Sequence, residues 1–171
     1  AEDTFVAIDA LTEGKVVLIG SSMGGWQSLL FARDHTDRMA GLVTIAAAPD
    51  FTEDGYWASF SVSQKSALEA DGQIELPSDY MEPYIITKRL IEDGRNQLVM
   101  RSPLDLPFPV RMLQGTADTA VSTNCAVRLQ GHASSPDMRL TLIKDADHRF
   151  SDGPCLGLIE RAVLEVMGET E

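Results

Sequence analysis

Basic residues are scarce in this chain of 171 residues. It has 14 lysines and arginines against 26 aspartates and glutamates, and its formal net charge is −12. An excess of negative charge repels phosphate backbones and anionic lipid surfaces. We therefore expect neither nucleic acid nor an anionic membrane surface as a partner. The length is enough for one domain.

Cysteines, long apolar runs and ion-binding patterns are also few or missing. The two cysteines, Cys125 and Cys155, fall on separate predicted helices. We interpret both as free buried thiols, which fits a reducing compartment. No apolar run approaches the ~20 residues of a membrane span. No Cys/His cluster has metal-ligand spacing, and Gly20–Gly25 does not match a phosphate-binding loop, so the sequence predicts neither a metal nor a cofactor.

The most informative motif is Gly20-Ser21-Ser22-Met23-Gly24, a G-x-S-x-G pattern directly after the apolar run Val16–Ile19. In this motif a strand turns tightly into a helix and holds the serine hydroxyl clear of the backbone. The glycines two residues before and after the serine, with Gly25, are expected to relieve crowding. We predict Ser22 as a nucleophile and the N–H of Met23 as an oxyanion donor at a helix N-terminus. A plain Gly/Ser-rich turn is the alternative.

A serine nucleophile needs a base, and the chain has three histidines: His35, His132 and His148. The first two fall near the ends of predicted helices. His148 follows the strand-like run Leu140–Ile143 and lies in a polar loop, where the base of the order Ser, Asp, His belongs. We predict His148 as the base, and an exposed loop histidine is the alternative.

The predicted acid is Asp118, which lies just past the strand-like run Val110–Gly115. There its carboxylate can accept the Nδ1–H of His148 and hold the correct tautomer. Asp147 is the rival, but adjacent loop residues rarely point at each other. A helix N-cap or turn aspartate is the other interpretation of Asp118.

The apolar runs predict an α/β fold with a mostly parallel sheet of about four strands and helices on both faces. Continuous apolar runs without alternation are typical of parallel strands covered on both sides, and strand–helix alternation predicts right-handed crossovers in a single domain, 1–171. The predicted strands are Val16–Ile19, Gly41–Ala46, Val110–Gln114 and Arg139–Ile143, and the predicted helices are 1–12, Met23–Ala32, Thr123–Gln130 and Leu156–Met167.

An insertion at about 50–106 interrupts this alternation and is predicted to be a helical lid. Its aromatic residues suit a cover over an apolar substrate, and a helical decoration of the sheet edge is the alternative. Within it we expect a helix at Gln64–Ala70, an extended piece at Gln73–Pro77 and a longer helix at Tyr84–Leu98. The predicted acyl pocket is lined by Met23, Trp26, Trp57 and Phe60.

Little sequence precedes the predicted nucleophile strand Val16–Ile19. In an α/β-hydrolase several strands come first, and one of their loops supplies the second oxyanion N–H. We therefore expect a fold truncated on its N-terminal side: a piece of a longer protein or a shortened hydrolase. The strand would then be an apolar edge without the lysines or prolines that guard edges. We expect it to pair with another copy or with a missing segment, or to aggregate.

Several segments resemble one group of α/β-hydrolases. They are Gly20–Trp26, Ala46–Thr52, Leu76–Tyr80, Ile85–Arg95, Leu113–Asp118 and Lys144–Arg149. The group is related to the mitochondrial palmitoyl-protein thioesterase and acyl-glucuronide esterase and has many bacterial members. The resemblance covers almost the whole chain, and the N-terminal third of the family pattern is absent. It implies Ser22, Asp118 and His148 as nucleophile, acid and base, and the hydrolysis of acyl thioesters or carboxylic esters.

The sequence thus predicts a serine hydrolase that acts on a small acyl ester or thioester, in the bacterial cytoplasm or, in a eukaryote, in mitochondria. A non-catalytic fragment or binding module that keeps an inherited triad is the competing function. A small-molecule carrier would not need Ser22, Asp118 and His148 in this order.

Overall fold

A computed structural model of the chain describes residues 2–77 and 82–168. It divides into two compact units. We call residues 1–49 with 99–171 the sheet unit, and residues 50–98 the inserted unit. Residues 99–106, which the sequence analysis placed with the insertion, cluster with the sheet unit.

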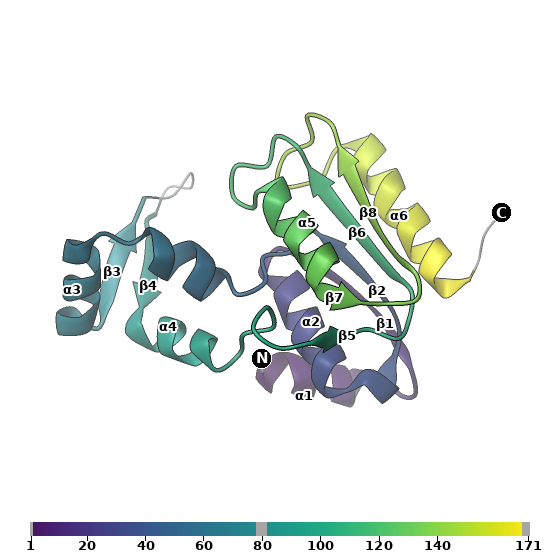
Figure 1. The fold of residues 1–171 in the computed structure, drawn as a ribbon, viewed down its shortest axis with the longest axis horizontal. Helices are drawn as coiled ribbons and strands as arrows, with labels where there is room; N and C mark the ends of the chain where they lie inside the picture. The colour runs from purple at the N-terminus through teal and green to yellow at the C-terminus, as the bar shows by residue number, and fades with distance from the viewer. Residues whose placement is uncertain (1, 78–81, 169–171) are drawn as a thin grey trace. The chain divides into compact units, whose positions relative to one another are not determined.

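The sheet unit is built on a parallel sheet of four strands in the order β1-β2-β6-β8 (Figure 1). They are β1 (Val16–Ser21), β2 (Met39–Ile45), β6 (Val110–Gly115) and β8 (Met138–Ile143). Every pairing within this sheet is parallel. The predicted mostly parallel sheet is confirmed, and each predicted strand differs from the observed one by at most two residues at either end.

Helices cover both faces of this sheet, with α2 and α5 on one side and α6 on the other (Figure 1). Continuous burial of β6 follows from this cover, because a strand covered on both sides has no face left for solvent. The helices of the sheet unit are α1 (Glu2–Leu11), α2 (Met23–Asp34), the 3-10 turn η1 (Thr36–Arg38), α5 (Thr123–His132) and α6 (Gly153–Met167). A small second sheet pairs β5 (Leu104–Asp105) with β7 (Ala133–Ser134).

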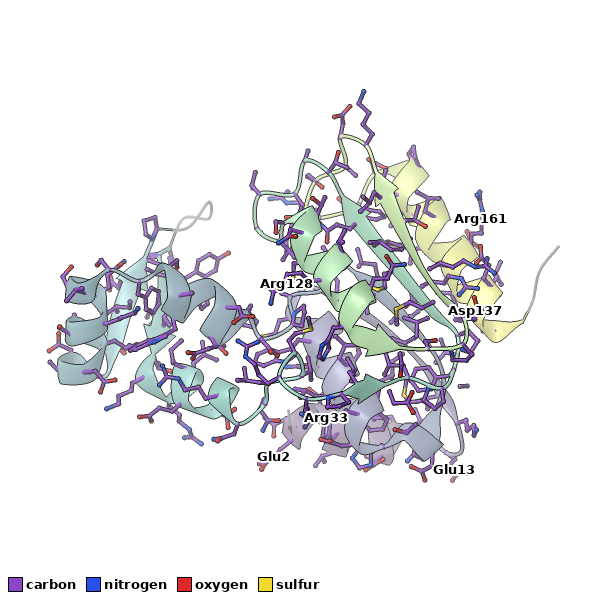
Figure 2. The ribbon with its side chains drawn as sticks, in the orientation of Figure 1. Glu2, Glu13, Arg33, Arg128, Asp137 and Arg161 are labelled. Atoms are coloured by element: carbon purple, nitrogen blue, oxygen red, sulfur yellow. The ribbon has the colours of Figure 1, made fainter. Side chains whose placement is uncertain are left out.

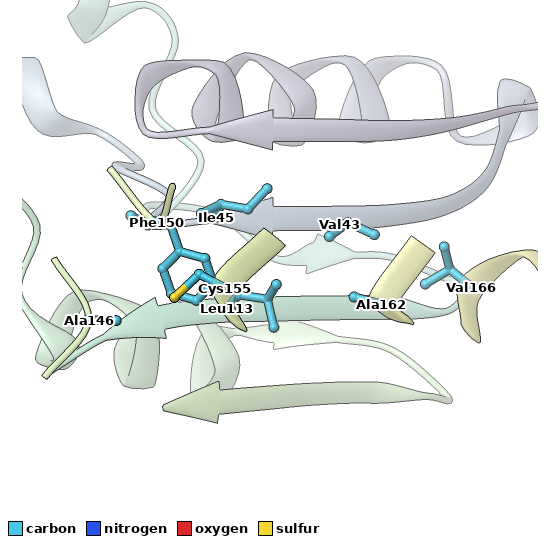
Figure 3. Packing of buried hydrophobic residues seen from close by; sticks show 9 residues of the cluster. Val43, Ile45, Leu113, Ala146, Phe150, Cys155, Ala162 and Val166 are labelled. Carbon is cyan, nitrogen blue, oxygen red and sulfur yellow. The ribbon is translucent and has the colours of Figure 1, made fainter. Parts of the chain in front are cut away.

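One hydrophobic core of the sheet unit lies between the sheet and α6 (Figure 3). Val43 and Ile45 of β2 and Leu113 of β6 contribute from the strands, while Ala162 and Val166 contribute from the helix. A Cβ added at Gly41 would stand 3.0 Å from the Cβ of Val166, so the helix packs directly on the β2 backbone. The same cluster includes Phe150, 1% exposed, from the loop after β8, so core packing also fixes the loop that carries His148.

One arginine is buried at the start of β6 and is fully paired. The side chain of Arg111 is 7% exposed, and it donates from Nε to Glu165 of α6 at 2.6 Å and from Nη2 to Asp137 at 2.9 Å. Asp137 is labelled beside β8 in Figure 2. A buried charge is tolerated only when it is paired and hydrogen-bonded. These bonds therefore tie α6 and the entry to β8 to the central strand.

The inserted unit contains a two-stranded antiparallel sheet and corrects one prediction. Tyr84–Leu98 is not one helix: Tyr84–Thr87 is strand β4, paired with β3 (Gln73–Leu76). The hydroxyl of Thr87 accepts from the N–H of Leu90 and begins helix α4 (Lys88–Arg95). The other elements of the inserted unit are the π-helix η2 (Phe51–Trp57) and the helix α3 (Val62–Asp71).

The inserted unit has its own small hydrophobic core. Phe60, Leu68, Ile86 and Ile91 are buried there, at 6% exposure or less. Trp57 packs against this core, and cations lie over its ring: Lys65 at 5.0 Å and Arg95 at 4.5 Å from the centroid. Such contacts stabilise by about 0.5–1 kcal/mol at exposed sites.

Strand β1 is an edge of the main sheet. It pairs with β2, and within residues 2–77 and 82–168 no other strand pairs with it. The side chain of Ile19 in this strand is 53% exposed. An edge strand with apolar exposed residues is a template for pairing with another chain. We propose that copies of the chain associate through β1.

The expected result is a mass by light scattering that rises with concentration above the 18.6 kDa of a single chain. Ile19→Lys should shift the mass toward that of a single chain, because a lysine on an edge opposes strand pairing. A constant mass of one chain across the whole concentration series would contradict the proposal.

Candidate active site

Ser22 lies at the turn between β1 and α2 with φ 52° and ψ −118°. This backbone conformation is strained for a residue with a side chain and persists only where its surroundings hold it. Here they do, because the N–H of Ser22 donates to Ile45 O at 2.9 Å and its carbonyl accepts from Gly25 N at 3.0 Å and Ala48 N at 3.1 Å. Neighbouring β2 and the loop that follows it therefore fix the serine.

Two glycines of the turn are required by close approach, and they are not the pair that the motif predicted. A Cβ on Gly20 would collide with the Gly24 carbonyl oxygen and lie 2.6 Å from Ser28 Oγ. A Cβ on Gly25 would lie 2.7 Å from the Cβ of Ala47, whereas a Cβ on Gly24 would meet nothing within 4 Å. The expected relief of crowding thus applies to Gly20 and Gly25, and the expectation for Gly24 is corrected.

The structure brings Ser22, His148 and Asp118 into one hydrogen-bonded row. His148 Nε2 lies 3.1 Å from Ser22 Oγ, and His148 Nδ1 lies 2.9 Å from Asp118 Oδ2. The three residues follow the carboxyl ends of β1, β8 and β6 respectively. These ends meet at one edge of a parallel sheet, which is where such folds place their ligand sites.

The carboxylate of Asp118 is held on both oxygens. Oδ1 accepts from Ala120 N at 2.9 Å and Val121 N at 2.8 Å, and Oδ2 accepts from His148 and from Gln114 Nε2 at 3.0 Å. Burial alone would raise the pKa of Asp118, but the bonds from Val121, His148 and Gln114 outweigh it and hold this pKa below its ordinary value. Asp118 is therefore ionised at neutral pH and can stabilise a positive imidazole.

Asp147 is turned away from the imidazole and onto the backbone. Its Oδ1 accepts from Arg149 N at 3.0 Å and Phe150 N at 3.2 Å, which closes a tight turn around His148. Asp145 and Phe150, on either side, have positive φ of 61° and 54°. The carboxylate that contacts the ring of His148 is that of Asp118.

The other predicted site residues are spread over both units. Met23 is the first residue of α2, so its N–H lies at the helix N-terminus, and its side chain is 49% exposed. Trp26 is buried in α2 at 6% exposure. Trp57 and Phe60 belong to the inserted unit, where Phe60 is part of the core. Their contribution to an acyl pocket stays a prediction.

The remaining histidines have structural partners. The ring of His35 stacks on Phe31 with centroids 4.7 Å apart and meets Phe5 edge-on at 5.4 Å. His132 Nε2 lies 3.1 Å from Val99 O and 2.9 Å from Ser102 O. Both rings are therefore engaged in tertiary contacts of the sheet unit.

Sequence reasoning missed Gln114, which it treated only as a strand residue. The signal was a glutamine that directly follows Leu113 in the predicted strand Val110–Gln114, four residues before Asp118.

The thiols differ from each other: Cys155 is buried and burial raises its pKa to about 11, whereas Cys125 is only half-buried. The expectation of two buried thiols is therefore correct for Cys155 alone.

Across residues 2–77 and 82–168 there is no group of three or more His, Cys, Asp or Glu side chains that could hold a metal ion. In the same residues no helix is both long and apolar enough to cross a membrane.

Comparison with known proteins identifies the family. The alpha/beta hydrolase fold family matches residues 1–95, more than half of the chain. The mitochondrial palmitoyl-protein thioesterase ABHD10 of Rattus norvegicus is 30% identical over 153 residues, which cover 88% of this chain and 51% of that protein. This chain thus spans about half the length of the curated relatives that match most of it.

Two solved structures are similar over nearly the full chain. A putative hydrolase from Agrobacterium vitis S4 has a TM-score of 0.90 and 35% identity, covering 96% of this chain and 66% of that one. The alpha/beta hydrolase domain-containing protein 10 from mouse has a TM-score of 0.87 and 26% identity, covering 98% and 68%. The chain belongs to the alpha/beta hydrolase fold family.

Proposed function

We propose that this chain carries the catalytic centre of a serine hydrolase that cleaves carboxylic esters or acyl thioesters. The observation that supports it best is the row from Ser22 Oγ through the His148 ring to Asp118 Oδ2, with links of 3.1 and 2.9 Å. Nucleophile, base and orienting acid at such distances have the geometry of acyl transfer through a covalent intermediate. Similarity to a protein named palmitoyl-protein thioesterase supports an acyl substrate.

In the proposed mechanism Ser22 Oγ attacks the acyl carbonyl while His148 Nε2 accepts its proton. Asp118 accepts the Nδ1–H and stabilises the imidazolium. His148 then protonates the leaving alcohol or thiol, and the acyl-serine remains. Water attacks this ester while His148 takes its proton, and His148 returns that proton to Ser22 Oγ as the acid is released. The side chain of His148 is 32% exposed, whereas that of Asp118 is fully buried, so the base is accessible and the acid is shielded.

The N–H of Met23 is the proposed oxyanion donor. It lies at the N-terminus of the twelve-residue helix α2, directly after the nucleophile. A helix N-terminus favours negative charge, and one oxyanion donor lowers the barrier by about 3–4 kcal/mol, or 10²- to 10³-fold in rate. We further propose that residues 50–98 form the lid. These residues are inserted in the sequence between β2 and β5, and they form a compact unit with its own hydrophobic core.

A fluorophosphonate probe tests the nucleophile directly. We expect the folded chain to take up one label, on Ser22, because only a serine activated by a base reacts quickly with such a probe. Ser22→Ala should abolish the label, and His148→Ala should slow it strongly. Ser21→Ala is the matched control and should keep it.

Labelling would also separate the proposed enzyme from a non-catalytic module that kept the three residues. Absence of label on the folded parent chain, or equal labelling of Ser22→Ala, would contradict the proposed function.

A further inference from the structure

Gln114 is the buried polar residue in contact with the acid of the site. It is the fifth residue of β6, is 1% exposed, and lies in a strand whose six residues are all buried. Its Nε2 has three oxygen neighbours: Asp118 Oδ2 at 3.0 Å, Val121 O at 3.0 Å and Gly115 O at 3.2 Å.

These neighbours fix the orientation of the amide. Oxygen and nitrogen of a glutamine side chain are told apart by their hydrogen-bond partners. A flipped amide would place Oε1 against three acceptor oxygens, so the end facing Asp118 must be the nitrogen. Within the described residues Gln114 Oε1 has no hydrogen-bond partner. Because Oε1 makes no hydrogen bond among these residues, the hydrogen bonds of this side chain are those that Nε2 donates.

The donor end shares one oxygen with the base. Asp118 Oδ2 accepts from Gln114 Nε2 and also from His148 Nδ1, at 3.0 and 2.9 Å. The other oxygen is already fixed by the N–H groups of Ala120 and Val121. If the carboxylate of Asp118 were held at Oδ1 alone, it could rotate and move Oδ2 away from the imidazole. The hydrogen bond from Gln114 Nε2 to Oδ2 prevents this rotation. The amide N–H also draws negative charge from the oxygen that faces the imidazole.

We propose that Gln114 is a positioning residue of the active site: it fixes Asp118 Oδ2 against His148 Nδ1 and limits the charge that this oxygen presents to the imidazole. The inference rests on the proposed function for its catalytic meaning and on geometry alone for the effect on His148. His148 is the charged side chain that lowers the pKa of Asp118. The neighbouring carboxylate of Asp147 accepts from the backbone N–H groups of Arg149 and Phe150.

Two substitutions separate positioning from simple packing. Gln114→Glu keeps the shape and places a second carboxyl about 3 Å from Asp118 Oδ2, where two carboxylates compete for one proton. When the introduced group ionises, its charge favours the protonated imidazole. We expect the titration midpoint of the His148 ring to rise by about one pH unit.

Gln114→Met removes the donor and keeps a side chain of similar length. We expect a smaller rise of the same midpoint and a fall of about tenfold in kcat with little change in KM, since the carboxylate loses its second restraint. Met112→Leu is the matched control: it changes a residue of the same strand that is 2% exposed and conserves its volume. Met112→Leu should leave the His148 midpoint and kcat unchanged.

The midpoint is measured by NMR titration of the histidine rings, with His35 and His132 as internal references. This readout needs no catalysis, so it decides the inference even if the parent chain fails to react with a fluorophosphonate. The pH–rate profile of ester hydrolysis is the second readout, and its acid limb should move to higher pH in both variants.

Thermal unfolding establishes which variants are folded. If Gln114→Glu does not fold, the His148 midpoint of Gln114→Met alone tests the positioning role. An unchanged His148 midpoint in the folded variants, relative to Met112→Leu, would overturn the positioning role. A loss of activity with that midpoint unchanged would assign Gln114 to packing instead.

Discussion

Replacing Ser22 with alanine is expected to reduce hydrolysis of short p-nitrophenyl esters by about 10⁴-fold or more, since the remaining site has no nucleophile. His148→Ala should cause a loss of similar size, because the proposed mechanism makes the two residues act as a unit: His148 Nε2 lies 3.1 Å from Ser22 Oγ and would accept its proton. Initial rates of purified, folded variants measure both effects.

Two aspartates give a matched test of the acid. Asp118→Asn should lower kcat by about 10⁴-fold, because an amide in this place favours the wrong imidazole tautomer. Asp147→Asn should keep most of the activity, since an asparagine oxygen can still accept from the backbone N–H groups of Arg149 and Phe150. The reverse order of these two effects would overturn the assignment of Asp118.

Histidine controls complete the series. His35→Ala should keep most of the activity, because its ring packs on Phe31 and Phe5 away from the serine. His132→Gln should do so as well, since an amide can still donate to a carbonyl such as Ser102 O. A loss comparable to that of His148→Ala in either variant would identify a different base.

The sequence was sufficient for the sheet and for the row of three residues because both depend on local patterns. β2 and β6 are covered on both sides, so their residues are buried almost throughout and show no regular polar alternation. Ser22 is marked by a turn that only small neighbours allow. The approach of His148 and Asp118 to Ser22 could be predicted because each residue follows a strand end, and parallel strands bring their carboxyl ends together.

Non-local contacts explain what the sequence did not predict. Tyr84–Thr87 has enough apolar residues for a helix, but β3 lies alongside and pairs with it, which a single window of sequence cannot show. The distinction between Gly24 and Gly25 depends on the approach of Ala47 from the loop after β2. The position of Gln114 Nε2 depends on how the loop to Val121 folds back over β6.

Gly115 lies where the loop that carries Asp118 touches the loop that carries His148, and this contact predicts a further large effect. A Cβ at Gly115 would collide with the carbonyl of Ala146 and stand 3.0 Å from Asp147 O. Both neighbours are backbone atoms directly before His148. The same Ala146 carbonyl accepts from Ala117 N at 3.0 Å, so the two loops are bonded at this point.

We expect Gly115→Ala to displace the segment Ala146–Asp147 and with it the imidazole. A displacement of about 1 Å from productive geometry can reduce the rate about 10²-fold, and forced overpacking destabilises the fold by about 1–3 kcal/mol. Chemical denaturation and initial rates measure the two effects separately. The fluorophosphonate labelling rate should fall with the hydrolysis rate, because both depend on the distance from His148 to Ser22.

Gly157→Ala makes the same chemical change where there is space. Gly157 is an exposed residue inside α6, and a Cβ there would meet nothing within 4 Å. This variant should be unchanged in activity and more stable by about 0.5–1 kcal/mol, since alanine favours a helix interior over glycine. Wild-type activity and stability in Gly115→Ala would show that the loop can yield without moving His148. A loss in activity alone, with stability kept, would mean that this contact serves the alignment of the base rather than the fold.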